Sequence, residues 1–306
     1  MEIKIGNLTL KNPIMPASGT FGYGVEYIDF IDLNKIGAVV TKGISLHPKI
    51  GNPPPRIFEG DGYLMNYIGL ENVGVEVFLK EKLPLIERFD TKIIVNFFGN
   101  TQDEYCKVAN ILSKSERIDA LEVNISCPNV KKGGIEFGIF PEEVYDLIVK
   151  IKNYTDKPLI VKISPQISDI KGVADAIEQA GGDAITAINT IKGLRINIEN
   201  ERYFYGGISG HFLKPIALRI IDELKKSTKL PIIGCGGIKN YEDVKEFIIC
   251  GAIAVQIGTY NFIEPNTLIK IIEKINDERK IEKIYKRDRR SSRATQCSIK
   301  NNRENR

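Results

Sequence analysis

The sequence predicts an α/β protein built as a single (β/α)8 TIM barrel, with a short N-terminal β-hairpin and long insertions after the second and sixth strands. Three observations predict this fold. Short apolar runs alternate with helix-like segments eight times along residues 13–277. The runs are continuously apolar, which is typical of parallel strands covered on both faces. The 306 residues, 42% of them hydrophobic, suffice for one barrel of this kind.

Each element has its own signal. Residues 2–10 alternate apolar and polar side chains around Gly6-Asn7, and we expect a hairpin that closes one end of the core. The eight strands are expected at 13–17, 37–42, 92–96, 119–125, 158–162, 183–188, 231–234 and 252–257. Helices are expected at 25–35, 74–88, 101–114, 141–153, 168–180, 214–227, 241–249 and 265–277. Two long insertions are expected at 43–75 and 190–210, and a loop as long as 43–75 is usually either functional or disordered.

The charge of the chain is unevenly distributed. Residues 279–306 hold 11 Lys and Arg against 3 Asp and Glu, so the net charge of +4 becomes −4 for residues 1–278. A mildly acidic body does not predict nucleic-acid binding. We therefore expect residues 1–278 to form the barrel domain, and residues 279–306 to be a basic, disordered tail without core-forming periodicity.

Cysteine and histidine usage excludes several kinds of site. The five cysteines form no CxxC pair and there are two histidines, so neither a disulfide framework nor a metal site is indicated. Apolar runs are too short to span a bilayer, and the N-terminus lacks the layout of a signal peptide. We expect a cytoplasmic protein.

In a barrel of this kind the chemistry lies at the carboxyl ends of the strands. Those positions carry polar residues or glycines, namely Ser18, Lys42, Asn96, Asn124, Lys162, Asn189, Thr190, Gly236, Gly237, Gly258 and Thr259. The two lysines indicate an anionic ligand, because an ammonium at the end of a buried strand is costly without a partner. The alternative is that both lysines extend their charged ends to solvent.

Glycines mark the ends of the last strands. The segments Ile233-Gly-Cys-Gly-Gly-Ile238 and Gln256-Ile-Gly-Thr259, with Gly206-Gly-Ile-Ser-Gly210 before them, let backbone N–H groups approach a phosphate. The alternative is that these glycines only permit tight turns. The carboxamides of Asn66, Asn124 and Asn189 offer donors and acceptors to a planar heterocycle. The pattern favours a phosphorylated aromatic cofactor beside a polar ring.

Cys127 is the one obvious base at these strand ends. It lies between two asparagines in Asn124-Ile-Ser-Cys-Pro-Asn129, directly after an apolar strand. A thiol in such a place can be reactive. The alternative is that Cys127 is a small buried hydrophobic residue, as most free cysteines are.

These segments resemble one known family. The motifs are Asn12-Pro13, Ala17-Ser-Gly-Thr-Phe-Gly-Tyr-Gly24, Thr41-Lys-Gly43, Gly51-Asn-Pro-Pro-Pro-Arg56, Asn66-Tyr-Ile-Gly-Leu70, Asn124-Ile-Ser-Cys-Pro-Asn129, Val161-Lys-Ile-Ser-Pro165 and Gly206-Gly-Ile-Ser-Gly210. Over residues 1–275 the chain resembles the class 1 dihydroorotate dehydrogenases, the FMN barrels of pyrimidine biosynthesis. Cys127 stands where class 2 enzymes carry a serine. The segment 129–134 resembles the NAD-linked 1B branch more than the fumarate-using 1A branch.

The resemblance implies a role for each matching position. One FMN per chain would contact Ser18, Lys42, Gly43, Asn96, Asn124, Lys162 and Ile188 with its ring, and Gly210, Gly236, Gly237, Gly258 and Thr259 with its phosphate end. The substrate would meet Lys42, Asn66, Tyr67, Ile68, Gly69, Leu70, Asn124, Asn189 and Thr190. Cys127 would remove the C5 proton of dihydroorotate while hydride leaves C6 for flavin N5, giving orotate. Closure of the 128–138 loop would shield this thiol.

The 1B branch also implies a partner. In that branch a second subunit carries FAD and a [2Fe–2S] cluster and reduces NAD, and the two subunits form a heterotetramer around a homodimer of the catalytic chain. This chain lacks the four clustered cysteines that such a cluster needs. Three alternatives stay open: a fumarate-dependent 1A homodimer, a flavoenzyme like the RNA dihydrouridine synthases that uses its basic tail to bind RNA, and a catalytically inactive barrel kept as a scaffold.

Overall fold

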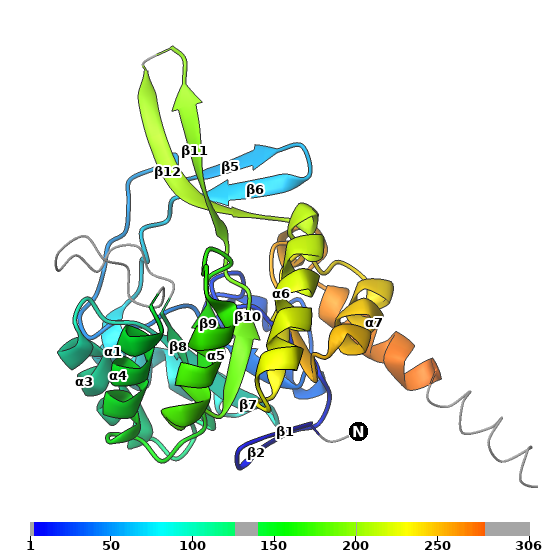
Figure 1. Cartoon of the computed structure of the whole chain (residues 1–306). Coiled ribbons are helices and arrows are strands. Elements are labelled where there is room, and N and C mark those ends of the chain that lie inside the picture. The colour runs from blue at the N-terminus through cyan, green and yellow to red at the C-terminus, as the bar shows by residue number, and fades with distance from the viewer. Residues whose placement is uncertain (1–2, 126–139, 200, 279–306) are drawn as a thin grey trace, which may run out of the picture.

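The computed structural model describes residues 3–125, 140–199 and 201–278. Its central sheet is parallel and runs in the order β3-β14-β13-β10-β9-β8-β7-β4. The strands are β3 (Ile14–Pro16), β4 (Ala38–Val40), β7 (Lys92–Phe97), β8 (Ala120–Asn124), β9 (Leu159–Ile163), β10 (Ala184–Ala187), β13 (Ile232–Cys235) and β14 (Ala254–Ile257). The two end strands meet where the Gly37 N–H donates to the Ile14 carbonyl at 2.9 Å. The predicted barrel is confirmed (Figure 1).

Helices surround the barrel between these strands (Figure 1). They are α3 (Gln102–Ser113), α4 (Pro141–Lys152), α5 (Ile170–Gln179), α6 (Lys214–Ser227), α7 (Tyr241–Cys250) and α8 (Tyr260–Ile263), followed by a helical segment over 267–278. Three of them begin where a polar side chain accepts a hydrogen bond from the N–H of the third helical residue: Thr101 before α3, Asp169 before α5 and Asn240 before α7. None of the helices in these described ranges has the length and apolar character to cross a membrane.

One expected helix is wrong. Residues 25–35 form two 3₁₀ turns, η1 (Val25–Tyr27) and η2 (Leu33–Lys35), with irregular backbone between them. The Asp32 side chain accepts a hydrogen bond from the Asn34 N–H and so starts the second turn. Asp in this position competes with continuous helix for the backbone donors.

The expected helix over 74–88 is interrupted. It consists of α1 (Gly74–Val77), a π-helical turn η3 (Phe78–Lys82) and α2 (Leu83–Ile86). Pro84 lies at the start of α2 and has no N–H to donate to the preceding turn. A wider turn before the proline accommodates this loss.

The inside of the barrel changes character along its axis. At the amino end of the strands, Met15, Ile94, Ile160 and other inward side chains pack on the hairpin of β1 (Ile3–Ile5) and β2 (Leu8–Leu10). The hairpin therefore closes that end, as predicted (Figure 1). Two residues further along the strands, the inward positions become polar, beginning with Asn96 on β7. Successive inward side chains lie two residues apart in a strand, so each strand can contribute one side chain to the apolar layer and the next to the polar layer.

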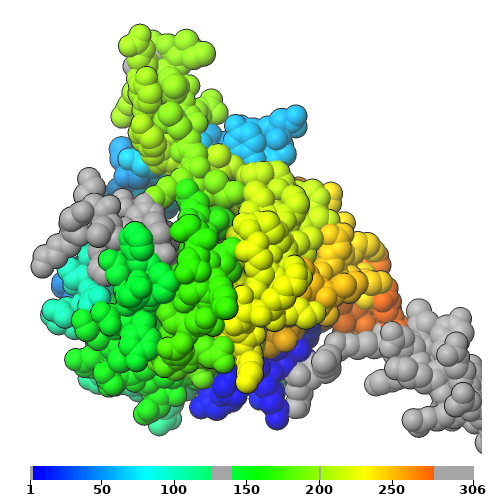
Figure 2. Space-filling model, in the orientation of Figure 1, coloured from blue at the N-terminus to red at the C-terminus, as the bar shows by residue number. Residues whose placement is uncertain are grey.

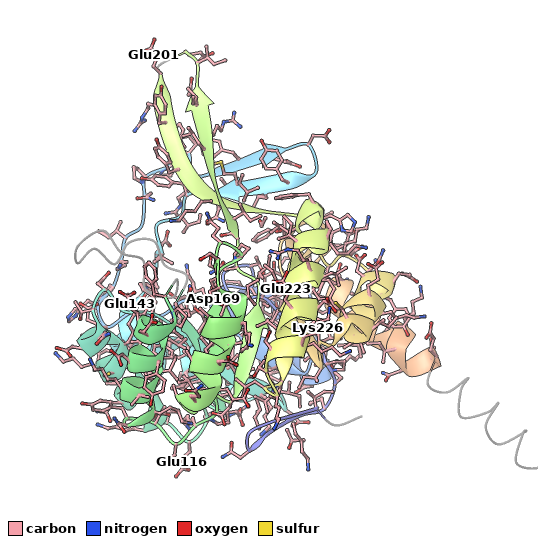
Figure 3. The ribbon with its side chains drawn as sticks, in the orientation of Figure 1. Glu116, Glu143, Asp169, Glu201, Glu223 and Lys226 are labelled. Atoms are coloured by element: carbon pink, nitrogen blue, oxygen red, sulfur yellow. The ribbon has the colours of Figure 1, made fainter. Side chains whose placement is uncertain are left out.

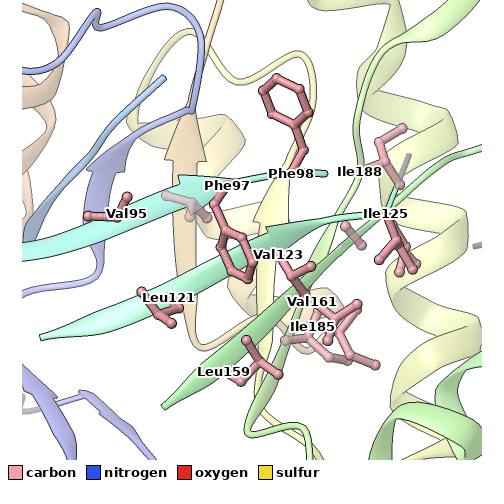
Figure 4. Close-up of a cluster of buried hydrophobic side chains, with 14 of the residues drawn as sticks. Val95, Phe97, Phe98, Leu121, Val123, Ile125, Leu159, Val161, Ile185 and Ile188 are labelled. Atoms are coloured by element: carbon pink, nitrogen blue, oxygen red, sulfur yellow. The ribbon is translucent and has the colours of Figure 1, made fainter. Parts of the chain in front are cut away.

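The outward side chains of the strands form the main core. Val95, Leu121, Val161 and Ile185 belong to a cluster that packs beneath the surrounding helices (Figure 4). Each lies between two inward positions of its strand, and all four are fully buried. Strands buried on both faces explain why their sequences are continuously apolar.

The two long insertions form a second sheet. β5 (Ile57–Gly60) and β6 (Tyr63–Asn66) come from the first insertion, and β11 (Ile191–Asn197) and β12 (Arg202–Ser209) come from the second. They pair antiparallel in the order β11-β12-β6-β5, above the carboxyl ends of the barrel strands. The β11–β12 arm projects from the body (Figure 2), with Glu201 at its tip and Glu116 at the opposite end of the molecule (Figure 3). The insertions are confirmed after the second and sixth barrel strands.

Candidate active site

Polar side chains of neighbouring strands meet at the carboxyl end of the barrel. Asn124 on β8 lies directly opposite Lys162 on β9. The Asn189 amide, which follows β10, donates to Asn124 Oδ1 at 3.4 Å. Asn189 in turn accepts a hydrogen bond from the Thr190 N–H at 2.8 Å. The structure thus brings together four residues that the sequence assigned to the site.

A fully buried carboxylate lies beneath them. Glu122 on β8 accepts hydrogen bonds from Asn96 Nδ2 at 2.7 Å, Thr186 Oγ1 at 2.8 Å and Gln256 Nε2 at 2.5 Å. The Lys162 ammonium lies 3.8 Å from Glu122 Oε1 and donates to Gln256 Oε1 at 3.1 Å. These five side chains come from five barrel strands, and we call them the floor network. A buried charge is stable only with such partners.

The floor network fixes which way its amides point. A carboxylate only accepts and an ammonium only donates, so Gln256 must direct its nitrogen to Glu122 and its oxygen to Lys162. By the same argument the Asn96 nitrogen faces Glu122, and its oxygen faces away from it. Asn96 Oδ1 is buried and has no hydrogen-bond partner among the residues described. Such an acceptor is expected to find a donor in a ligand.

Lys42 lies at the same end of the barrel, after β4, the strand that pairs with the Asn96 strand β7. Its ammonium is 5.6 Å from the ring centroid of Tyr23, which is a cation–π distance. Burial lowers the pKa of Lys42 from its ordinary value, while the charges of Glu71 and Glu26 oppose that change. An ammonium held partly out of water is prepared to bind an anion.

The glycine-rich loops converge at another part of the mouth. Thr259, after β14, donates to Ser209 Oγ at 2.8 Å, beside Gly210 at the end of β12. Gly236 and Gly237 follow β13 with φ angles of 129° and 76°. A Cβ on Gly237 would lie 2.6 Å from the Lys214 backbone nitrogen, so only glycine fits there. A Cβ on Gly258 would make an ordinary contact of 3.5 Å, so that loop has free space.

The loop 66–70 forms the roof of the site. Asn66 ends β6 and donates to the Gly207 carbonyl of β12 at 3.3 Å. Asn52 holds the middle of the loop, because its side chain donates to the Tyr67 carbonyl and its N–H to the Ile68 carbonyl, both at 2.9 Å. Leu70 ends the loop with a φ of 59°.

Asn72 anchors this loop to the barrel. Its Oδ1 accepts from the N–H groups of Ser45 at 3.1 Å and Gly74 at 2.8 Å. Its Nδ2 donates to the Leu70 carbonyl at 2.9 Å and to Ser45 Oγ at 2.8 Å. Asn72 is 4% exposed, so water does not replace these bonds. One buried amide therefore joins the roof to the segment after β4.

Comparison with known proteins decides the family. The profile of the family described as dihydroorotate dehydrogenase matches residues 1–278. The chain belongs to the dihydroorotate dehydrogenase family. It is 48% identical over 279 residues to a dihydroorotate dehydrogenase B (NAD(+)) catalytic subunit of Thermodesulfovibrio yellowstonii, covering 90% of this chain and 92% of that one. Proteins with the same name from Geotalea uraniireducens and Geotalea daltonii are 46% and 47% identical, over 89% and 90% of this chain and 91% and 92% of theirs.

The remaining positions that the family resemblance assigned lie around the same mouth. Ser18 follows β3 and is half-buried. Gly43 lies against the floor network, since a Cβ there would be 3.2 Å from Asn96 Oδ1. Ile188 is buried beside Gly236, and its N–H donates to the Cys235 carbonyl at 2.7 Å. Tyr67 and Gly69 belong to the roof loop.

Two assignments lie outside the described residues. Cys127 and the 128–138 loop fall in the range 126–139, and the basic tail falls in 279–306. The role of Cys127 and the disorder of the tail therefore stay predictions.

Sequence reasoning missed the residues that hold the site together. Glu122, Thr186 and Gln256 lie inside strands that otherwise read as apolar. Their signal was present, since a carboxylate in the middle of a buried strand needs partners. Asn72 had no comparable signal, because its bonds depend on how the insertion returns to the barrel.

Proposed function

We propose that this chain oxidises (S)-dihydroorotate to orotate in de novo pyrimidine biosynthesis, using one FMN per chain and passing electrons through a partner subunit with FAD and [2Fe–2S] to NAD. The observation that carries the proposal is the mouth of the barrel. The acceptor Asn96 Oδ1, buried and without a hydrogen-bond partner among the described residues, and the buried ammonium of Lys162 lie at the bottom of the same polar layer. Family membership supports the same reaction.

The residues present fit FMN. The Asn96 oxygen can accept from an N–H of a flavin ring, and Lys162 can meet its negative charge. Gly210, Gly236, Gly237, Gly258 and Thr259 form loops where backbone N–H groups can receive a phosphate. When bound, FMN supplies a hydride acceptor.

The substrate would lie between floor and roof. Lys42, with its pKa lowered by burial, would bind the carboxylate of dihydroorotate. Asn66, Asn124 and Asn189 offer both donors and acceptors, which suits the imide edges of the ring. The roof loop, anchored through Asn72, would exclude water from the reacting carbons.

Cys127 would act as the base that takes the C5 proton. In the sequence it follows the last residue of β8, Asn124, by three residues. A thiol near its ordinary pKa is a weak base at neutral pH, so shielding from water is part of this proposal. Cys127 is not among the residues that the structure describes.

Two measurements test this function. The purified chain should be yellow, with flavin absorption near about 450 nm that is released on denaturation. Cys127→Ala should reduce orotate formation by about 100-fold or more, as expected for loss of a general base. The matched control is Cys250→Ala, because that thiol lies on α7 and donates to the Leu218 carbonyl. Equal activity of the two variants would refute the role of Cys127.

The electron acceptor needs a separate assay. We propose a homodimer of this chain within a cytoplasmic heterotetramer, in line with the relatives named as catalytic subunits of an NAD(+) enzyme. NAD reduction should require an added FAD and [2Fe–2S] subunit. Turnover with fumarate by this chain alone would instead assign it to the 1A type.

A further inference from the structure

Glu122 is a buried charge for which the proposed reaction has no use. It is fully buried on β8, below the level of Asn124 and Lys162. Its three neutral donors come from β7, β10 and β14, so the carboxylate lies at the centre of the barrel. Removing a carboxylate from water costs several kcal/mol in general, and packing alone does not require one here.

The arrangement has two consequences for the groups above it. Glu122 receives the Asn96 nitrogen, which directs the Asn96 oxygen away from the network. Glu122 also lies 3.8 Å from the Lys162 ammonium and holds it a second time through Gln256, whose amide bridges the two charges. The position and the charge of the upper groups therefore both depend on one carboxylate.

We propose that Glu122 is a positioning residue that sets the reduction potential of the flavin by offsetting the charge of Lys162. This inference rests on the proposed function, because it requires FMN at the mouth. Two-electron reduction adds negative charge to a flavin, so a positive charge nearby favours the reduced form. The Glu122 carboxylate opposes that effect and keeps the potential lower than Lys162 alone would set it.

The variant Glu122→Gln tests the charge while keeping the shape. Its amide oxygen still accepts hydrogen bonds, its amide nitrogen makes one neighbouring amide turn its oxygen inward, and Lys162 loses its counter-charge. A unit charge within about 10 Å, at an effective dielectric constant of about 20, changes an equilibrium by about tenfold or more. We expect the ratio of affinities for reduced and oxidised FMN to rise about tenfold, which raises a two-electron potential by about 30 mV.

A matched control separates charge from structure. Thr186→Val removes one hydrogen bond from the same carboxylate without changing any charge. It should loosen the floor network but leave the reduction potential of the flavin within a few mV of its value in the parent protein. Potentials are measured by dye-coupled spectroscopic titration of the FMN-bound proteins, so the readout does not depend on turnover.

The reciprocal variants complete the test. Lys162→Met should lower the reduction potential of the flavin. The double variant Glu122→Gln with Lys162→Met should have a higher reduction potential than Lys162→Met alone. This last comparison also serves if Glu122→Gln does not fold, because the double variant buries no charge in the pair. An unchanged or lowered potential in both comparisons, or an equal shift in Thr186→Val, overturns the inference.

Failure of the proposed function would look different. A chain that binds no FMN, or that binds it and makes no orotate, refutes the function itself. A chain that makes orotate with a potential insensitive to Glu122 refutes only this inference.

Discussion

The anchor of the roof loop gives the sharpest stability prediction. Asn72→Ala removes the acceptor of two backbone N–H groups, on Ser45 and Gly74, and the donor to the Leu70 carbonyl. A buried group left without a partner costs about 1–3 kcal/mol, and these costs add incompletely. We therefore expect the free energy of unfolding to fall by about 2–4 kcal/mol, which lowers Tm by about 4–8 °C for a protein of this size.

Thermal unfolding followed by circular dichroism measures this change, with Asn153→Ala as the control because Asn153 is exposed at the end of α4. The same Asn72 variant should raise KM for dihydroorotate more than it lowers kcat, because we propose that the roof loop binds the substrate while the floor network remains intact. A Tm loss no larger than that of the control would show that the anchoring argument is wrong.

Three further predictions concern charge and space. Hydrogen bonds from Thr228 and the backbone lower the pKa of Glu178, so Glu178→Gln should destabilise the fold at neutral pH, and the difference should disappear in urea titrations as pH falls through the range below 4.5. Burial lowers the pKa of Lys42, so in the unfolded chain this lysine keeps its proton to a higher pH than in the folded one, and the parent protein gains stability as pH approaches 10.5. Lys42→Met should remove this gain in the same urea titrations. It should also abolish dihydroorotate binding measured by calorimetry. Gly258→Ala should leave the Tm of the apoprotein unchanged yet weaken FMN binding by fluorescence titration, whereas Gly237→Ala should lower both, since only Gly237 lacks room for a Cβ.

The sequence was informative wherever a local pattern determines the element. The eight apolar runs become the eight barrel strands, and Thr101, Asp169 and Asn240 start helices close to the predicted positions. Local patterns misled where a single residue redirects the backbone. Asp32 divides the expected helix at 25–35, and Pro84 forces a wider turn into the next one.

The site was predictable in its outline and not in its connections. Lys42, Asn96, Asn124 and Lys162 could be placed at one end of the barrel, because strand ends in a parallel barrel converge. The bonds among Glu122, Thr186 and Gln256 join strands distant in sequence, and no local period encodes them. The same holds for the second sheet, in which two insertions that read as loops pair with each other.

The pairing of β6 with β12 has a consequence for biosynthesis. Asn66 and Gly207 bond to each other across 141 positions of the chain. The segment that carries Asn66 leaves the ribosome long before β12, so the edge of β6 that pairs with β12 is unpaired until β12 has been synthesised. A nascent or truncated chain that ends before β12 therefore still has the Asn52 and Asn72 bonds of the roof loop but lacks the strand with which Asn66 pairs, so the upper sheet is completed only after the sixth barrel strand and its extension have emerged.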